Sequence, residues 1–145
     1  MHMRGRLEDS DFSDLEELLY HRYLLDQWVE GQFVGVGFRF PGQSVNRQKY
    51  SEPKDVLFSE TDEYARFGVL EYPVTAVTKS LPNQELEIFN FYPKHRPLEL
   101  NYAHSEIWCD CPQRQQVNIV PSPGVRKIFR TELSRYARVR ISAQT

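Results

Sequence analysis

Polar and apolar residues alternate with a period of two between Asn101 and Cys111. Successive side chains of a β-strand point to opposite faces of a sheet, so this alternation predicts a strand. One face is small and mostly apolar, and it carries Ala103, Ser105, Ile107, Cys109 and Cys111. The other face carries Tyr102, His104, Glu106, Trp108 and Asp110. We expect the first face to pack in the core, and the second to be either a solvated sheet face or the floor of a site.

Apolar residues at helical spacing predict one helix near each end of the chain. Ser13-Asp14-Leu15-Glu16 has the form of a capping box, and leucines recur at three- and four-residue steps until Gly31, a C-terminal cap. Near the other end, Ser122-Pro123 is typical of a helix start. The apolar stripe of that second helix is Val125, Ile128, Phe129, Leu133 and Tyr136. Residues 138–141 either continue this helix or form a last strand.

The segments between the two helices alternate or read as extended. We expect strands at 33–40, at 64–78 with a break at Pro73, at 86–92, at 101–111 and at 117–120. This order predicts a single α+β domain over residues 1–145, with a mostly antiparallel sheet of about five to six strands and an N-terminal and a C-terminal helix packed on it. We expect residues 1–9 to form a flexible or loosely packed N-terminus.

The bulk composition is that of an ordinary globular protein, with a net charge of -2 that makes no general case for nucleic acid or membrane. The charge is uneven, because residues 1–30 carry eight acids and three bases whereas residues 111–145 carry seven bases and one acid. We expect the two ends to attract each other across one fold; the alternative is a basic surface for a partner. We expect no tight binding to duplex DNA.

The chain has no apolar run near the ~20 residues that a transmembrane helix needs, and its first residues lack the apolar core of a signal peptide. We therefore expect a cytoplasmic protein with no membrane association. Cys109 and Cys111 are its only cysteines. Two residues on the same strand face lie roughly 6.5–7 Å apart at Cα, too far for a comfortable disulfide, so both are expected to be reduced and to face the core.

The longest polar segment without a solubilising charge run is 43–53, which we expect to be a loop. It combines two cations with neutral hydrogen-bonding groups, a set that suits an anionic, oxygen-rich ligand. The candidate ligand-binding residues in it are Asn46, Arg47, Lys49, Tyr50 and Ser51, and Tyr102 and Trp108 of the alternating stretch are further candidates. The alternative is an ordinary surface loop in which Ser51 caps a short helix through Leu57.

His104 and Glu106 are the strongest catalytic candidates, because residues two apart on a strand can converge on the same atom. A histidine beside a carboxylate can transfer protons near neutral pH, and His95 is a weaker third candidate. A metal triad like that of non-haem iron oxygenases needs a further histidine that normally follows in the sequence, and none follows His104. We therefore predict no metal and no cofactor. Gly-x-Ser-x-Gly is absent, so nucleophilic serine catalysis is not indicated.

Two functional hypotheses follow, and the sequence leaves open whether the chain is an enzyme. In the first, Arg47 and His104 share one site that binds a phosphate-bearing small molecule or RNA, with metal-independent, ribonuclease-like acid/base chemistry. The loop supplies cations without a general base, and the strand supplies the acid/base pair. In the second, the chain is a non-catalytic interaction module, including the case of a homodimer, and Tyr102 and Trp108 anchor the partner.

Overall fold

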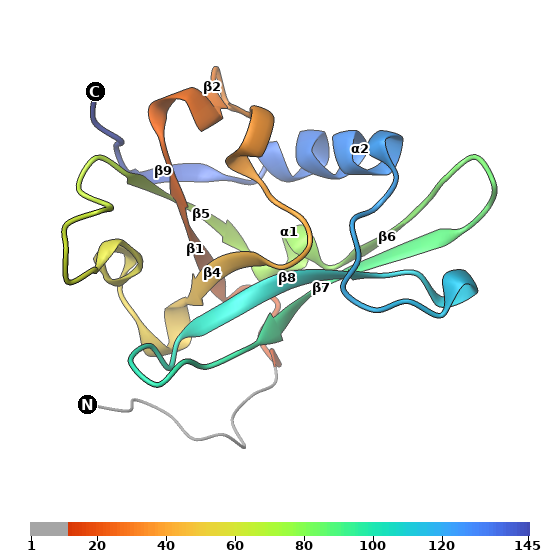
Figure 1. The fold of residues 1–145 in the computed structure, drawn as a ribbon, viewed down its shortest axis with the longest axis horizontal. Helices are drawn as coiled ribbons and strands as arrows, with labels where there is room; N and C mark the ends of the chain where they lie inside the picture. Colours follow the sequence, from red (N-terminus) through yellow and green to blue (C-terminus); the bar gives the residue numbers. More distant parts are fainter. Residues whose placement is uncertain (1–11) are drawn as a thin grey trace.

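A curved antiparallel sheet of seven strands, shaped like half a barrel, forms most of the molecule in the computed structural model, which describes residues 12–145 (Figure 1). Its strand order is β6-β7-β8-β4-β1-β5-β9. The strands are β1 Leu18–Tyr23, β4 Gln43–Arg47, β5 Gly68–Pro73, β6 Lys79–Pro82, β7 Ile88–His95, β8 His104–Asp110 and β9 Arg138–Ile141. A separate hairpin consists of β2 Trp28–Val29 and β3 Gln32–Phe33.

Helical segments are few and mostly short. The longest is α2, Pro123–Ser134, and α1 spans only Val74–Val77. The 3₁₀-helices are η2 Leu25–Gln27, η3 Gly35–Gly37, η4 Gln48–Tyr50, η5 Pro53–Leu57 and η6 Pro112–Arg114. Within the described residues, no helix is long and apolar enough to cross a membrane.

The main core lies between one face of the sheet and α2. Phe129 of α2 stacks on Phe91 of β7 with ring centroids 4.2 Å apart, and both side chains are buried. The same cluster includes Leu19, Val45, Tyr72, Ile107 and Leu133. A smaller cluster of Tyr20, Val56 and Val69 covers part of the other face, where η5 packs. The sheet therefore has an inner face towards α2 and an outer face that is only partly covered.

The alternation along β8 is confirmed. Ala103, Ser105, Ile107, Cys109 and Cys111 are all buried, whereas His104, Glu106, Trp108 and Asp110 on the outer face are partly exposed. Cys109 and Cys111 are free and buried, as expected for reduced core thiols. Tyr102 differs from the expectation, because the turn before β8 buries it against Tyr50 and Ala103.

The predicted fold class is wrong, because the main sheet has seven strands instead of five to six and the expected N-terminal helix is absent from the described residues. The region after Ser13 forms β1, η2 and the β2–β3 hairpin instead. β1 lies between β4 and β5, so it makes ladder hydrogen bonds on both sides and places alternate residues such as Leu19 and His21 in the core. This central pairing outweighs the helical preference of its leucines. The C-terminal helix, in contrast, is present as α2, and residues 138–141 form β9.

Three further segments differ from the expectations. Residues 33–40 do not form one strand, since β3 ends at Phe33 and η3 begins at Gly35. The close approach of the Gln27 carbonyl requires a glycine at position 37. Residues 43–53 are not a loop but β4, η4 and η5, and Ser51 donates to the Arg47 carbonyl. Residues 117–120 form no strand. The expected break at Pro73 is confirmed, because β5 ends there and α1 begins.

The expected flexible N-terminus at 1–9 lies outside the described residues. The expected attraction between the acidic and the basic end of the chain involves three acids that lie outside the described residues. Within residues 12–145, Glu17 pairs with Arg47 and Arg140 pairs with Glu71.

Candidate functional site

A pocket of about 760 Å³ opens on the outer face of the sheet, and we call it the His104 pocket. Its floor comes from β1, β4 and the start of β8, and its walls come from residues 55–64 and from the turn at 98–103. Its lining includes Arg22, Ser44, Asn46, Asn101 and His104.

The register of β4 and β8 brings three polar side chains together on this floor. Asn46 pairs with His104, and Ser44 pairs with Glu106. Directly opposed residues of antiparallel strands have Cβ atoms about 4.5–5.5 Å apart and share a face. Val45, between Ser44 and Asn46, points to the opposite face and is fully buried in the core. Ser44, Asn46 and His104 are therefore neighbours that border one cavity.

His104 is held in a defined orientation. Its Nδ1 lies 2.7 Å from the carbonyl oxygen of Arg96. A carbonyl can only accept, so Nδ1 carries the proton, and in the neutral ring Nε2 is the acceptor. Nε2 lies 3.3 Å from Ser44 Oγ, whose hydroxyl can donate to it. The Arg96 carbonyl thus orients the His104 ring, and His104 Nε2 faces the Ser44 hydroxyl. Proton abstraction from a hydroxyl requires this arrangement.

Asn46 presents a buried donor that has no acceptor. The residue is 1% exposed, and its Oδ1 accepts a hydrogen bond of 2.8 Å from Asn101 Nδ2. Asn46 Nδ2 makes no hydrogen bond with any described residue. Leaving a buried polar group unsatisfied costs about 1–3 kcal/mol. A ligand oxygen accepting from Nδ2 would recover that free energy.

The charge around the pocket is mixed. Arg22 is fixed by a 2.9 Å hydrogen bond from Nη1 to the Val56 carbonyl, and its guanidinium lies 3.9 Å from the centre of the Tyr64 ring. Three carboxylates, those of Asp55, Glu60 and Glu63, line the wall formed by residues 55–64. One permanent cation facing three carboxylates disfavours a ligand with several negative charges.

Five of the residues predicted from the sequence line this pocket, and five do not. Those that line it are Asn46, Tyr50, Ser51, Tyr102 and His104. Those that do not are Arg47, Lys49, His95, Glu106 and Trp108. The two predicted segments are therefore brought together, but without the two cations that the sequence suggested.

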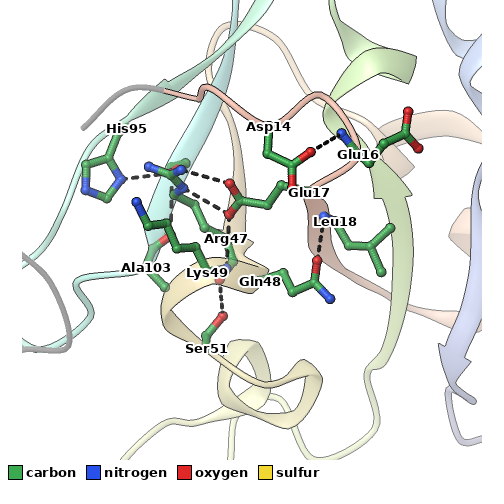
Figure 2. Close-up of polar contacts among 11 residues, drawn as sticks. Asp14, Glu16, Glu17, Leu18, Arg47, Gln48, Lys49, Ser51, His95 and Ala103 are labelled. Carbon is green, nitrogen blue, oxygen red and sulfur yellow. Dashed lines mark hydrogen bonds and ion pairs between the residues drawn. The ribbon is translucent and has the colours of Figure 1, made fainter. Parts of the chain in front are cut away.

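Arg47 is on the inner face of the sheet, opposite to His104. It pairs in register with the core residue Leu19 and is 1% exposed. Its guanidinium makes two hydrogen bonds to Glu17, from Nε at 3.1 Å and from Nη2 at 2.8 Å (Figure 2). Phe12 stacks on it, with 3.8 Å between Cζ and the ring centre. The expectation that Arg47 and His104 share one site is therefore wrong. Asn46 of β4 points to the same face as His104, and the next residue, Arg47, points to the opposite face.

The remaining candidates are also placed apart from the pocket. His95 is buried on the inner face beside Ser105, and burial together with the nearby Arg47 lowers its pKa to about 4. Glu106 Oε1 accepts a 2.9 Å hydrogen bond from Trp108 Nε1. Lys49 is exposed, and its backbone N–H donates to Glu17. Glu106 therefore orients Trp108, and the hydrogen bonds of the His104 ring go to Arg96 and Ser44 instead.

Sequence reasoning missed Arg22, Asn101 and the pairing of Ser44 with His104. Arg22 stood in a segment assigned to a helix, and the role of Ser44 depends on a register that the sequence does not show. Asn101 was visible as the polar residue that begins the alternating stretch. Its side chain could have been connected to Asn46 only after both strands had been paired.

No group of three histidine, cysteine, aspartate or glutamate side chains within residues 12–145 is arranged to hold a metal ion. No family model matches the chain, and comparisons with curated proteins and with solved structures give no match.

Proposed function

We propose that the His104 pocket binds a nucleotide-like phosphodiester and that His104 acts as its general base. The observation that carries this proposal is the chain of contacts from the Arg96 carbonyl through His104 to Ser44, in a pocket with an unsatisfied donor on Asn46. The fixed tautomer leaves Nε2 ready to take a proton without a metal ion.

The reaction that suits these groups is transesterification of an RNA linkage. The 2′-hydroxyl loses its proton to His104 Nε2 as its oxygen attacks phosphorus. The bond from phosphorus to the 5′-oxygen breaks, and the leaving oxygen takes a proton from water. The hydroxide formed in this way takes the proton from His104 Nε2, which restores the neutral ring. Asn46 Nδ2 donates to a phosphate oxygen, and Arg22 balances the charge of the diester. Atoms and charge balance without an oxidant or a second substrate.

The charge of the pocket supports a diester rather than a terminal phosphate. A diester carries one negative charge, which Arg22 can balance, whereas a monoester carries roughly 1.5–2 charges at neutral pH. The carboxylates of Asp55, Glu60 and Glu63 can accept hydrogen bonds from ribose hydroxyls or base amino groups. We therefore expect weaker binding of nucleoside monophosphates than of dinucleoside monophosphates.

The test is a cleavage and binding assay with a panel of ribodinucleoside monophosphates and their 2′-deoxy analogues. We expect cleavage of at least one ribodinucleotide and binding without cleavage of its deoxy analogue. Replacing a general base removes roughly 10²–10⁴-fold of rate, so His104→Gln should lower the rate by at least about 10²-fold. Ser44→Ala should weaken binding, while the exposed Ser142→Ala is the matched control.

Two results would overturn the proposal. One is the absence of binding by every member of the panel to the folded protein. The other is a folded His104→Gln variant that cleaves as fast as the parent. A rate unchanged in both Ser44→Ala and His104→Gln would also show that contaminating nuclease causes the cleavage.

A second candidate is an interaction module, and exposed apolar side chains at the pocket rim favour it. Phe58 is 73% exposed and Leu100 is 74% exposed, and both border the pocket together with Leu98. Tyr102, the anchor suggested by the sequence, is only 7% exposed and does not suit that role. Self-association at high concentration that is abolished by Leu100→Ser, with no nucleotide binding, would favour this candidate over the first.

A further inference from the structure

Three cationic side chains of α2 surround a second pocket, which we call the Arg126 site. It has a volume of about 450 Å³ and lies between α2 and the β2–β3 hairpin. Its lining residues are Gln32, Phe33, Gly35, Pro123, Arg126, Lys127, Arg130 and Thr131. None of them lines the His104 pocket, so the two sites are separate.

The walls of the Arg126 site are fixed to each other by hydrogen bonds. The Phe33 N–H donates to Ser134 Oγ at 3.2 Å, and the Ser134 hydroxyl donates to the Arg130 carbonyl at 2.7 Å. Arg130 Nη2 donates to the Phe38 carbonyl at 2.7 Å. The hairpin, the segment after η3 and the helix are therefore held together around the pocket.

The positive charge in this site is not balanced. No carboxylate lines the pocket, and Arg126, Lys127 and Arg130 make no ion pair with any residue that the structure describes. Arg126 and Arg130 are four positions apart on one helix face, a spacing at which like charges repel. Burial and then the charge of Arg126 lower the pKa of Arg130. An anion between the two guanidinium groups would relieve this repulsion.

Two donors in the site are buried and have no acceptor. The Nε atoms of both Arg126 and Arg130 are inaccessible to solvent and make no hydrogen bond within residues 12–145. In a guanidinium, Nε–H and one Nη–H form the fork that binds two oxygens of a carboxylate or phosphate. The unsatisfied Nε–H groups therefore indicate where oxygen atoms of a ligand belong.

We propose that the Arg126 site binds the terminal phosphate group of a phosphate monoester or free inorganic phosphate. A dianionic group matches the unsatisfied Nε–H donors of Arg126 and Arg130 and the ammonium of Lys127, and the pocket is large enough for part of the attached molecule. The two pockets therefore differ in the ligand charge that they favour, because the carboxylates of the His104 pocket disfavour a dianion. The inference depends on Arg126 and Arg130 and holds even if the His104 pocket has another function.

The test is a two-dimensional NMR titration of the arginine Nε–H resonances with inorganic phosphate and with adenosine monophosphate, against sodium chloride at matched ionic strength. We expect the resonances of Arg126 and Arg130 to shift with saturation, and Arg126→Gln to weaken binding by about tenfold or more, the scale of one charge-assisted hydrogen bond. Arg126→Lys should bind with intermediate affinity because it keeps the charge and loses the fork. Tighter binding of the nucleotide than of phosphate identifies the ester as the ligand, and equal binding identifies the free anion.

Arg135→Gln is the matched control, since Arg135 follows α2 directly, is exposed and does not line the pocket. Its affinity for phosphate should stay within about twofold of that of the parent, as expected for a screened surface charge. Equal losses of phosphate affinity in Arg126→Gln and Arg135→Gln would show that only the net charge of the protein matters, and would overturn the proposal. Chloride producing the same shifts as phosphate, or binding only of a glutamate-rich peptide, would also overturn it.

Discussion

Arg47 makes a buried ion pair in the core, and its removal provides a quantitative test of this assignment. In Arg47→Met, the Glu17 carboxylate loses two hydrogen bonds, of 3.1 Å and 2.8 Å, and keeps the one from the Lys49 N–H. Removing one member of a buried pair leaves an uncompensated charge and costs about 3–5 kcal/mol. At about 2–4 °C per kcal/mol for a domain near this size, the melting temperature should fall by about 6–20 °C.

The assay is urea denaturation of the parent, Arg47→Met and Arg47→Met combined with Glu17→Gln. Glutamine keeps an acceptor for the Lys49 N–H but carries no charge, so the double variant should be clearly more stable than Arg47→Met alone. Binding to the His104 pocket should be preserved in the folded double variant. A stability loss below about 1 kcal/mol, accompanied by loss of ligand binding, would refute the reasoning, because surface substitutions cost about that much or less.

Three further predictions concern the core. Burial lowers the pKa of His21 from 6.5 to about 4, so the unfolded chain binds the proton at a higher pH than the folded protein does. About 3 kcal/mol of stability is therefore present above pH 6.5 and is lost as the pH falls to about 4. An NMR titration in which the His21 ring of the folded protein is protonated near pH 6.5 would contradict this. Burial, with smaller contributions from Asp110 and Cys111, raises the pKa of Cys109 to about 12, so a thiol reagent should label it slowly in buffer and rapidly in urea. Fast labelling of the folded chain would place Cys109 outside the core. Gly37→Ala should lower the free energy of unfolding by about 1–3 kcal/mol, measured by urea denaturation, because the added Cβ meets the Gln27 carbonyl. Gly124→Ala is the control, since a Cβ there meets nothing within 4 Å. Equal stability of the two variants would contradict this packing.

The sequence predicts β8 well because its alternation is local, and burial then follows the same period of two. It fails for β1, because the leucines there have helical spacing. The strand is stabilised by pairing with β4 and β5, which lie far from β1 along the chain. The pocket could be predicted only in part for the same reason. Adjacent residues of β4 point to opposite faces: Asn46 faces the pocket and Arg47 faces the core. Only the strand register, which pairs Arg47 with Leu19 and Asn46 with His104, distinguishes them.

The most direct test of the central claim is the side-chain amide resonance of Asn46 in a titration with a 2′-deoxydinucleoside monophosphate, which binds without reacting. Our account predicts that the Asn46 Nδ2 protons move downfield as they gain an acceptor, with the ring signals of His104 changing along the same binding curve. In Asn46→Ala the His104 shift should persist at weaker affinity. Saturable binding that leaves both Asn46 and His104 unperturbed and moves resonances elsewhere would contradict the assignment of the His104 pocket.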